Sequence, residues 1–185
     1  MIMDIDIASK QVGKLKYTFN VDASYDLKRR VTGIGIIIRE TDQPRKKGPV
    51  IAEISELHSN ISAGETEKFA VFRALEIASE RNYEILHIRS DYNNMRRKLK
   101  EDHEVGIGHE RDDLHGQILK YAKKFTEVKF LYCRRRKNLM AHRLARKAVK
   151  ESMPQENDTA MNYETSQWCN EDNDEWSEDW NEDCG

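Results

Sequence analysis

Four side chains that are far apart in the chain are of the types that bind divalent cations. Asp22 lies in the alternating stretch YTFNVDAS, Glu67 opens the helix-like ETEKFAVFRALEIA, Asp91 follows the run YEILHIRS, and His142 lies early in NLMAHRLARKAV. Carboxylates are natural ligands for hard cations, and imidazole suits transition ions. Three carboxylates gathered without cations would repel one another. If these residues converge, they predict a site for divalent metal ions.

Hydrophobic periodicity predicts the elements that position these residues. From Tyr17 the residues alternate, which predicts a strand with Asp22 on its polar face. A capping box from Ser62 to Glu65 predicts the start of a helix in which Glu67 points toward the sheet. The complete prediction is strands at about 17–24, 31–40, 50–58, 83–90 and 128–136, helices at about 63–81, 92–100, 114–126 and 138–151, and an irregular segment at 101–113.

The order of these elements is βββ-α-β-α-α-β-α, which indicates the fold class. Three consecutive strands with short links predict an antiparallel meander, and the later strands are joined by helical crossovers. We therefore expect an α/β fold with a mixed five-stranded sheet and helices on both faces. Asp91 would lie at the C-terminal end of a strand, where α/β proteins commonly place their chemistry.

The charge divides the chain into two parts. All 31 Lys and Arg lie in residues 1–150 together with 21 acids, which gives 31 − 21 = +10, whereas residues 151–185 carry the other 12 acids. A basic body suggests a polyanionic partner. Residues 153–185 read as an acidic, disordered tail that contains every tryptophan, and it either folds over the basic face or docks on another protein.

The cysteines and apolar segments indicate where the protein resides. Cys133, Cys169 and Cys184 show no metal-type pairing, and two of them lie in the tail. No apolar run reaches the length of a signal peptide or a membrane span. We expect a cytoplasmic protein without a membrane partner, with a short extension at 1–16 and one domain at 17–152.

Four local patterns together resemble ribonuclease H type 1, in the superfamily that includes the reverse-transcriptase-like ribonuclease H domains. They are Asp22-Ala-Ser, Glu67-x-x-Ala-x-x-x-Ala-Leu, Ser90-Asp91 and Asn138-x-x-Ala-x-x-Leu-Ala, in the family's order over about residues 17–150. His142 stands where the family usually has a fourth aspartate, a replacement also found among reverse-transcriptase-like members. The segment before the last helix, RRRK, lacks the mobile histidine that some members use for product release.

The resemblance implies a metal-dependent endonuclease that cuts the RNA strand of RNA/DNA hybrids. Two divalent ions would activate a water molecule and relieve charge on the leaving oxygen. Asp22, Glu67, Asp91 and His142 are the expected catalytic and metal-binding residues, with Asp91 bridging the ions or positioning the water. Because imidazole suits manganese better than magnesium, we expect Mn²⁺ to support activity better than Mg²⁺.

Substrate binding is expected to use basic and polar side chains near these residues. Arginine and lysine contact phosphates, whereas recognition of RNA requires hydrogen bonds to the 2′-hydroxyl. The candidates are Ser24, Asn60, Asn93, Arg134, Arg135, Arg136 and Lys137.

Each candidate also has an ordinary structural interpretation. Asp22 could be a strand-end turn residue, Glu67 an exposed helix carboxylate, Asp91 a helix cap and His142 a histidine at the edge of the core. A protein with the same fold that binds nucleic acid without cutting it remains an alternative, as does a nuclease of the same superfold with another substrate.

Overall fold

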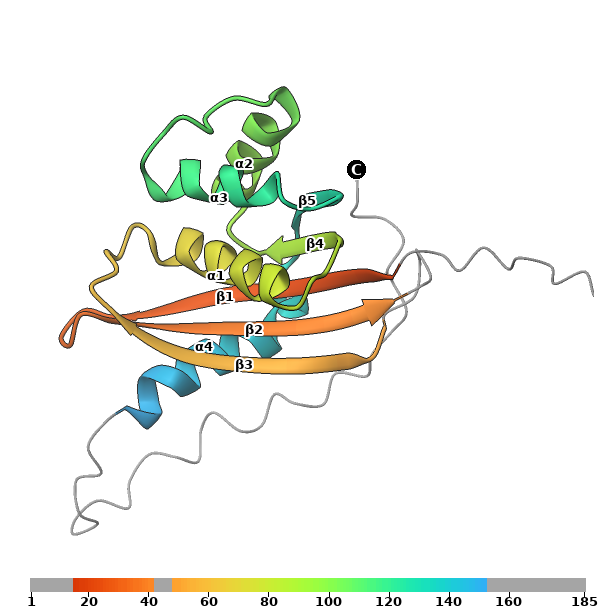
Figure 1. The fold of residues 1–185 in the computed structure, drawn as a ribbon. Coiled ribbons are helices and arrows are strands. Elements are labelled where there is room, and N and C mark those ends of the chain that lie inside the picture. The colour runs from red at the N-terminus through yellow and green to blue at the C-terminus, as the bar shows by residue number, and fades with distance from the viewer. Residues whose placement is uncertain (1–14, 42–47, 153–185) are drawn as a thin grey trace, which may run out of the picture.

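The computed structural model describes residues 15–41 and 48–152, and its core is a five-stranded sheet flanked by helices (Figure 1). The predicted tail at 153–185 lies outside the described residues, as does the predicted N-terminal extension apart from its last two residues. The elements are β1 (Lys16–Asp26), β2 (Val31–Thr41), β3 (Val50–Ser59), α1 (Thr66–Glu80), β4 (Ile85–Ser90), α2 (Asn93–Val105), α3 (Leu114–Ala122), β5 (Glu127–Tyr132), the 3-10 helix η1 (Arg135–Lys137) and α4 (Leu139–Glu151).

The strands are arranged in the order β3-β2-β1-β4-β5. β1 and β2 are antiparallel, as are β2 and β3, whereas β4 lies parallel to both β1 and β5. The predicted mixed sheet and the predicted order of elements are therefore confirmed. In this arrangement the C-terminal ends of β1, β3, β4 and β5 all lie along the same edge of the sheet, the edge formed by strand ends.

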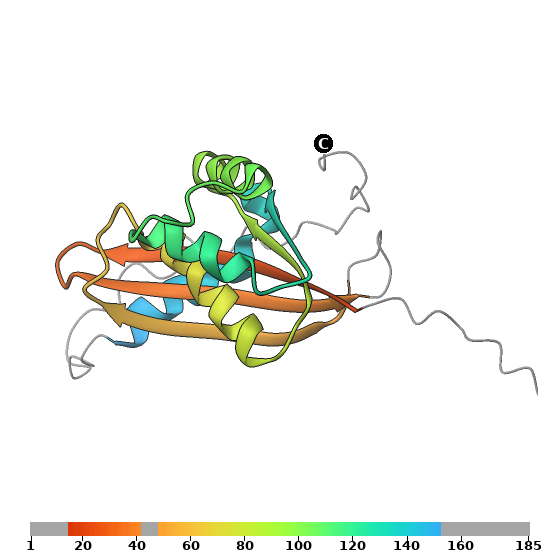
Figure 2. The same ribbon diagram turned by 45° about the horizontal axis from the view of Figure 1, so that its top comes forward.

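Helices cover both faces of the sheet (Figures 1 and 2). On one face α1 packs against β1, β2 and β4 with α3 beside it, and α2 packs against β5. On the other face α4 crosses β1, β2 and β3. The predicted inner side of α1 is confirmed, because Ala70, Ala74 and Ala78 are fully buried against the sheet.

Alternation along β1 separates the core from the polar face, as period-2 strand geometry requires. Phe19 and Val21 are fully buried in the cluster under α1. Asn20 and Asp22 point to the opposite face, where they contact residues at the start of α4. Asp22 therefore lies on the polar face of the strand, where the sequence pattern predicted it.

Two glycines in β2 allow α4 to lie close to the sheet. A Cβ atom on Gly33 or Gly35 would overlap the backbone carbonyls of Ala145 and Ala141, respectively. Because helix backbone atoms cannot move aside singly, these positions hold α4 at the distance that brings its first turn to β1.

Several predicted boundaries were wrong. The helix α1 begins at Thr66 without a side-chain cap, because Ser62 and Glu65 form a turn in which the Ser62 hydroxyl donates to the Glu65 carboxylate (2.7 Å). The helix α2 continues into the predicted irregular segment as far as Val105 and ends at Gly106, whose φ of 75° gives a left-handed C-cap. The rest of that segment, residues 106–113, contains no helix or strand, as predicted. β5 stops at Tyr132, and the following arginines form η1.

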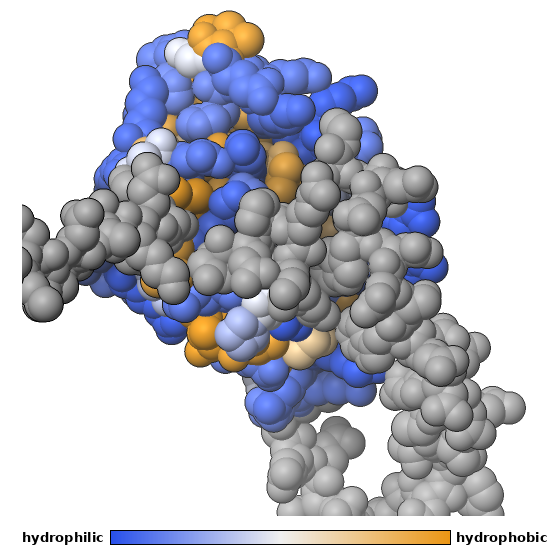
Figure 3. Space-filling view, turned by 90° about the vertical axis from the view of Figure 1, so that its right-hand side faces the viewer, coloured by the Kyte–Doolittle hydropathy of each residue, from blue (hydrophilic) through white to orange (hydrophobic). Residues whose placement is uncertain are grey.

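The side of the molecule where β1 begins and β2 ends is mainly hydrophilic, with small separate hydrophobic patches among the described residues (Figure 3). Leu15, Val50 and Ile51 are among the exposed large apolar side chains of the described chain. No helix in residues 15–41 and 48–152 has the length and apolar character needed to cross a membrane.

Candidate active site

The parallel pairing of β1 and β4 brings the first two carboxylates to one edge of the sheet. Asn20 pairs with Arg89, so Asp22 and Asp91 each lie two residues beyond the same point of the register. Asp22 is almost completely buried, and the side chain of Asp91 is 11% exposed. Two acids that are distant in sequence thus face the same space at the C-terminal ends of neighbouring strands.

Glu67 joins this pair from the first turn of α1. The backbone N–H of Ala23 donates to its carboxylate, but its buried Oε2 has no hydrogen-bond partner among the described residues. Burial raises the pKa of Glu67 to about 8, and the negative charges of Asp22 and Asp91 add to this effect. A buried carboxylate oxygen without a donor is costly. A bound cation could serve as the missing partner of this oxygen.

His142 approaches the same edge from the first turn of α4. Its Nδ1 lies 2.7 Å from Oδ2 of Asp22. Burial raises the pKa of Asp22, and the hydrogen bond to His142 partly offsets this rise. Because an ionised carboxylate can only accept, Nδ1 of His142 is the donor in this hydrogen bond. A histidine that donates one ring N–H to a carboxylate while the other nitrogen stays available is the usual arrangement around metal ions.

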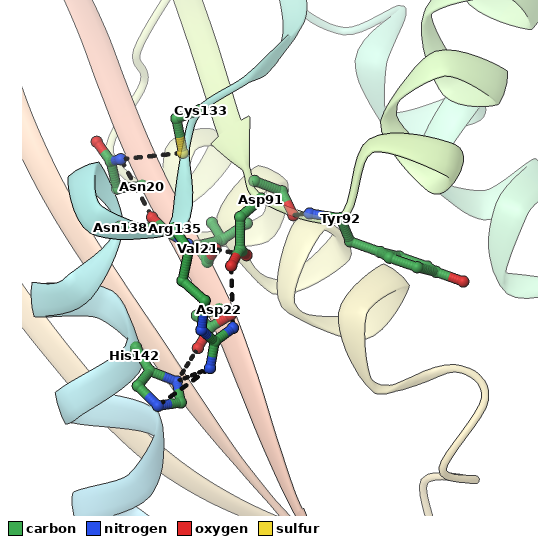
Figure 4. A network of polar contacts seen from close by, with 10 residues as sticks. Asn20, Val21, Asp22, Asp91, Tyr92, Cys133, Arg135, Asn138 and His142 are labelled. Carbon is green, nitrogen blue, oxygen red and sulfur yellow. Dashed lines mark hydrogen bonds and ion pairs between the residues drawn. The ribbon is translucent and has the colours of Figure 1, made fainter.

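Arg135 completes the arrangement (Figure 4). Its Nη1 donates to Oδ2 of Asp91 (3.0 Å), and its Nη2 lies against the ring of His142, 3.3 Å from Nδ1 and 3.2 Å from Nε2. Its positive charge lowers the pKa values of Asp22 and Glu67 and so opposes their mutual repulsion. The guanidinium group is therefore the cation that the carboxylates share in this structure.

Asn138 connects the start of α4 to β1 and to Asp91 through its side-chain amide. Its Nδ2 donates to the backbone oxygen of Val21 (2.9 Å) and weakly to Oδ1 of Asp91 (3.4 Å), and its Oδ1 accepts from Asn20 (3.2 Å). The side chain is 1% exposed. The start of α4 is thus tied to β1 and to Asp91 by one buried amide.

Cys133 lies beside this amide network but is not suited to nucleophilic chemistry. Burial raises the pKa of its thiol to about 12, and Asn20 donates a long hydrogen bond to its sulfur (3.8 Å). A nucleophilic cysteine needs a lowered pKa and access to solvent. The reactive groups of this site are therefore its carboxylates and not the Cys133 thiol.

The donor set fits a divalent cation, although the side chains do not enclose one as they stand. Within residues 15–41 and 48–152, no three His, Cys, Asp or Glu side chains are arranged to hold a metal ion. Arg135 lies between Asp91 and His142, and Oε2 of Glu67 has no partner. Three carboxylates and one imidazole lone pair are suitable ligands for Mg²⁺ or Mn²⁺. These side chains would have to move closer together to hold a metal ion, and the guanidinium of Arg135 would have to leave Asp91.

The residues predicted to bind nucleic acid lie around the same edge, and their role stays a prediction. Ser24 follows Asp22 in β1, Asn60 comes directly after β3 with a φ of 65°, and Asn93 opens α2. The basic run lies between β5 and α4, where three of its members are exposed and one is half-buried. In chain order these are Arg134, Arg135, Arg136 and Lys137.

Sequence reasoning missed two features of the site. It gave no role to Asn20, although the alternation of β1 places this residue on the same face as Asp22. It assigned Arg135 to substrate phosphates and did not foresee its ion pair with Asp91, 44 residues away. No local pattern in the sequence carries that second signal.

Comparison with known proteins identifies the family to which the chain belongs. The sequence profile of the Reverse transcriptase-like family matches residues 20–148. No curated protein sequence matches the chain. The matched range contains Asp22, Glu67, Asp91 and His142.

Solved structures with similar folds include ribonucleases H and foamy-virus protease-reverse transcriptases. RNase H1 of the archaeon Halobacterium salinarum NRC-1 has 15% identity and a TM-score of 0.59, covering 74% of this chain and 99% of its own. The N-terminal RNase H domain of a Mycobacterium tuberculosis protein has 18% identity and a TM-score of 0.57, covering 74% and 95%. LC11-RNase H1, solved in complex with an RNA/DNA hybrid, has 17% identity and a TM-score of 0.53, covering 76% and 100%. At these identities the likeness concerns the fold, and together with the profile it establishes that the chain belongs to the Reverse transcriptase-like family of the ribonuclease H-type superfamily.

Proposed function

We propose that this protein is a metal-dependent endonuclease that hydrolyses the RNA strand of RNA/DNA hybrids by a two-metal-ion mechanism. The observation that carries the proposal is the convergence of Asp22, Glu67 and Asp91 at one edge of the sheet, with a raised pKa and an unpartnered oxygen on Glu67. Members of the same fold family have been solved with RNA/DNA hybrids, LC11-RNase H1 among them. This supports the choice of substrate.

The proposed chemistry assigns a task to each side chain. Asp22, Glu67, Asp91 and His142 would hold the ions, which when bound supply a deprotonated water and neutralise charge on the leaving oxygen. Asp22 accepts a hydrogen bond from Nδ1 of His142 and so orients the imidazole ring. Asn138 holds the start of α4 to β1 and to Asp91 through its side-chain amide.

A cleavage assay tests the proposal directly. Hydrolysis of a labelled hybrid should require a divalent ion and should be abolished by Asp91→Asn while binding of the hybrid is retained. Duplex DNA and duplex RNA serve as comparison substrates, because the superfold hosts nucleases of several specificities. If duplex DNA were cut and the hybrid were not, the assigned substrate would be wrong.

The choice of metal is a second part of the proposal. A neutral imidazole in place of a charged ligand weakens the attraction for Mg²⁺ more than that for Mn²⁺. We therefore expect a higher rate with Mn²⁺ than with Mg²⁺ when each is saturating. Equal rates would remove the assigned role of His142 in metal preference.

The main rival is a module that binds hybrids without cutting them. The ion pair between Arg135 and Asp91 favours this alternative, because it occupies a ligand oxygen. Tight binding of the hybrid, with no cleavage in Mg²⁺ or Mn²⁺ at any concentration, would establish the rival.

The acidic segment at 153–185 is a further proposed partner-binding element, either toward the basic body or toward another protein. All three tryptophans, Trp168, Trp176 and Trp180, lie in it, so its environment can be followed by their emission. A shift of this emission on adding salt to the isolated full chain would support docking on the body. A shift that requires a second protein would support the other view.

A further inference from the structure

Arg135 makes contacts that a simple phosphate-binding residue does not need. Its guanidinium reaches Oδ2 of Asp91 at 3.0 Å and the ring of His142 at 3.2 Å, although its side chain is 61% exposed and could extend into water. An exposed arginine loses side-chain entropy when it is held in one position. The charge of the site compensates for that loss, because Asp22, Glu67 and Asp91 are all close by.

We propose that Arg135 is a displaceable internal cation, which occupies the metal-binding side chains of the ion-free protein and is released toward a substrate phosphate when divalent ions bind. This inference rests on the proposed function, since it concerns the same carboxylates. It assigns to Arg135 a positioning role that links the metal state of the site to its grip on the substrate.

The competition follows from the atoms involved. A guanidinium is always protonated and has no lone pair, so it cannot itself be a metal ligand. It uses the Oδ2 lone pair of Asp91, and its Nη2 lies against the ring of His142, 3.3 Å from Nδ1 and 3.2 Å from Nε2. A divalent ion held by Asp91 would need the same carboxylate oxygen. Arg135 and a metal ion therefore exclude each other at Oδ2 of Asp91.

The location of Arg135 permits its release. It opens η1, the short 3-10 helix between β5 and α4, and its exposed side chain is not packed in the core. The backbone of this segment stays anchored, because Asn138 N–H donates to the Arg135 carbonyl (2.9 Å). A rotation of the side chain alone would move the guanidinium off the carboxylates. Its planar fork suits a phosphate, which it can bind through two parallel hydrogen bonds.

Arg136 provides a matched control. It is the next residue of η1, carries the same charge and is also exposed. Among the described residues no hydrogen bond or ion pair involves its side chain. Removing it changes the net charge near the site by the same amount without freeing a ligand atom.

The test is isothermal titration calorimetry, in which Mn²⁺ is added to the full chain. The pH is 8.5, which is above the pKa of about 8 of Glu67. The site component is defined as the binding that Glu67→Gln abolishes, which separates it from weak binding to the acidic segment. We expect Arg135→Ala to tighten this component about three- to tenfold, because an exposed ion pair of modest strength no longer competes. Arg136→Ala should change it by less than about twofold. Arg135→Lys keeps the charge but lacks the fork, and it should lie between wild type and Arg135→Ala.

A second readout addresses the released state. With saturating Mn²⁺, Arg135→Ala should raise the KM for the hybrid more than it lowers kcat, since the lost contact is to a phosphate outside the bond that is cut. Equal Mn²⁺ affinity in Arg135→Ala and Arg136→Ala would overturn the displacement. Weaker Mn²⁺ binding in Arg135→Ala would overturn it as well, because Arg135 would then support the metal. If wild type itself had no component sensitive to Glu67→Gln, the metal site would be absent and the proposed function would fall together with this inference.

Discussion

Replacing Glu67 by glutamine removes a carboxyl group whose ionisation the fold opposes. Burial and the charges of Asp22 and Asp91 raise its pKa from 4.5 to about 8. Between pH 4.5 and about 8, the Glu67 carboxyl therefore keeps its proton in the folded state and loses it in the unfolded state. Stability from this group is fully present below about pH 4.5 and is lost as pH rises through about 8.

The size of this effect follows from the shift. The difference between 4.5 and about 8 is about 3.5 pH units, and at about 1.4 kcal/mol per unit it sets an upper bound of about 5 kcal/mol. Glu67 is only half-buried and lies near Arg135, so solvent and that charge screen the repulsion. We expect about 2–3 kcal/mol to be lost in the ion-free protein between pH 5 and pH 9.

Urea unfolding in a chelator, at several pH values from 5 to 9, measures this quantity. The free energy of unfolding of wild type minus that of Glu67→Gln should fall by about 2–3 kcal/mol across the range, because glutamine mimics the protonated acid at every pH. Glu65→Gln, two residues earlier on an exposed turn, should run parallel to wild type. Saturating Mg²⁺ should remove most of the difference above pH 8. A wild-type curve that stays parallel to Glu67→Gln would refute the claim that this carboxyl is buried among like charges.

Three other predictions concern the elements around the site. Gly35→Ala should destabilise the protein by about 3 kcal/mol in urea unfolding, since the new Cβ overlaps the Ala141 carbonyl, while Gly64→Ala, which meets nothing within 4 Å, should be near neutral. Asn138→Ala should cost about 2–3 kcal/mol because it leaves buried polar groups on β1 without partners, and hybrid cleavage should fall further than the folded fraction does. His142→Asp should raise the ratio of the Mg²⁺-supported to the Mn²⁺-supported cleavage rate, and an unchanged ratio would argue against ligation by this residue.

The parts of the fold that depend on short-range patterning were predictable. The alternation of β1 placed Asp22 on the face opposite Phe19, and the structure has both side chains there. The spacing of the small residues Ala70, Ala74 and Ala78 identified the buried side of α1. In each case the periodicity of the residues is itself the physical cause of burial, so reading it is sufficient.

Helix ends were predicted less well because they depend on competing local hydrogen bonds. The Ser62 hydroxyl could cap a helix or bind the Glu65 carboxylate, and the sequence alone does not choose between these. Gly106 ends α2 with a left-handed φ, and a glycine is a common helix stop in sequence. The polar residues before it show no helical pattern in the sequence, which is why the helix was predicted to end too early. They are helical because Met95 and Leu99 bury one side of that helix.

The pairings within the site lay beyond sequence reasoning. The contact between His142 and Asp22 spans 120 residues, and that between Arg135 and Asp91 spans 44. The first depends on the close approach of α4 to β2 that Gly33 and Gly35 allow, and the second on the course of η1. A basic run before a helix indicates affinity for phosphate, but which of its members turns back toward the acids is a matter of backbone direction in η1.

Charge accounts for why an imidazole and an arginine occur together at this site. The three carboxylates carry three negative charges at most, and Arg135 reduces this to two. Two divalent ions would bring four positive charges, so the three acids alone leave one in excess, which a single phosphate of the substrate neutralises. If Arg135 remained at Asp91 the site would keep a second, uncompensated positive charge at short range, where its repulsion of the ions is strong. Electrostatic balance therefore favours a guanidinium that leaves as the ions and the phosphate arrive. In their absence one arginine neutralises one of three negative charges, whereas a fourth acid in place of His142 would leave three of four unpaired.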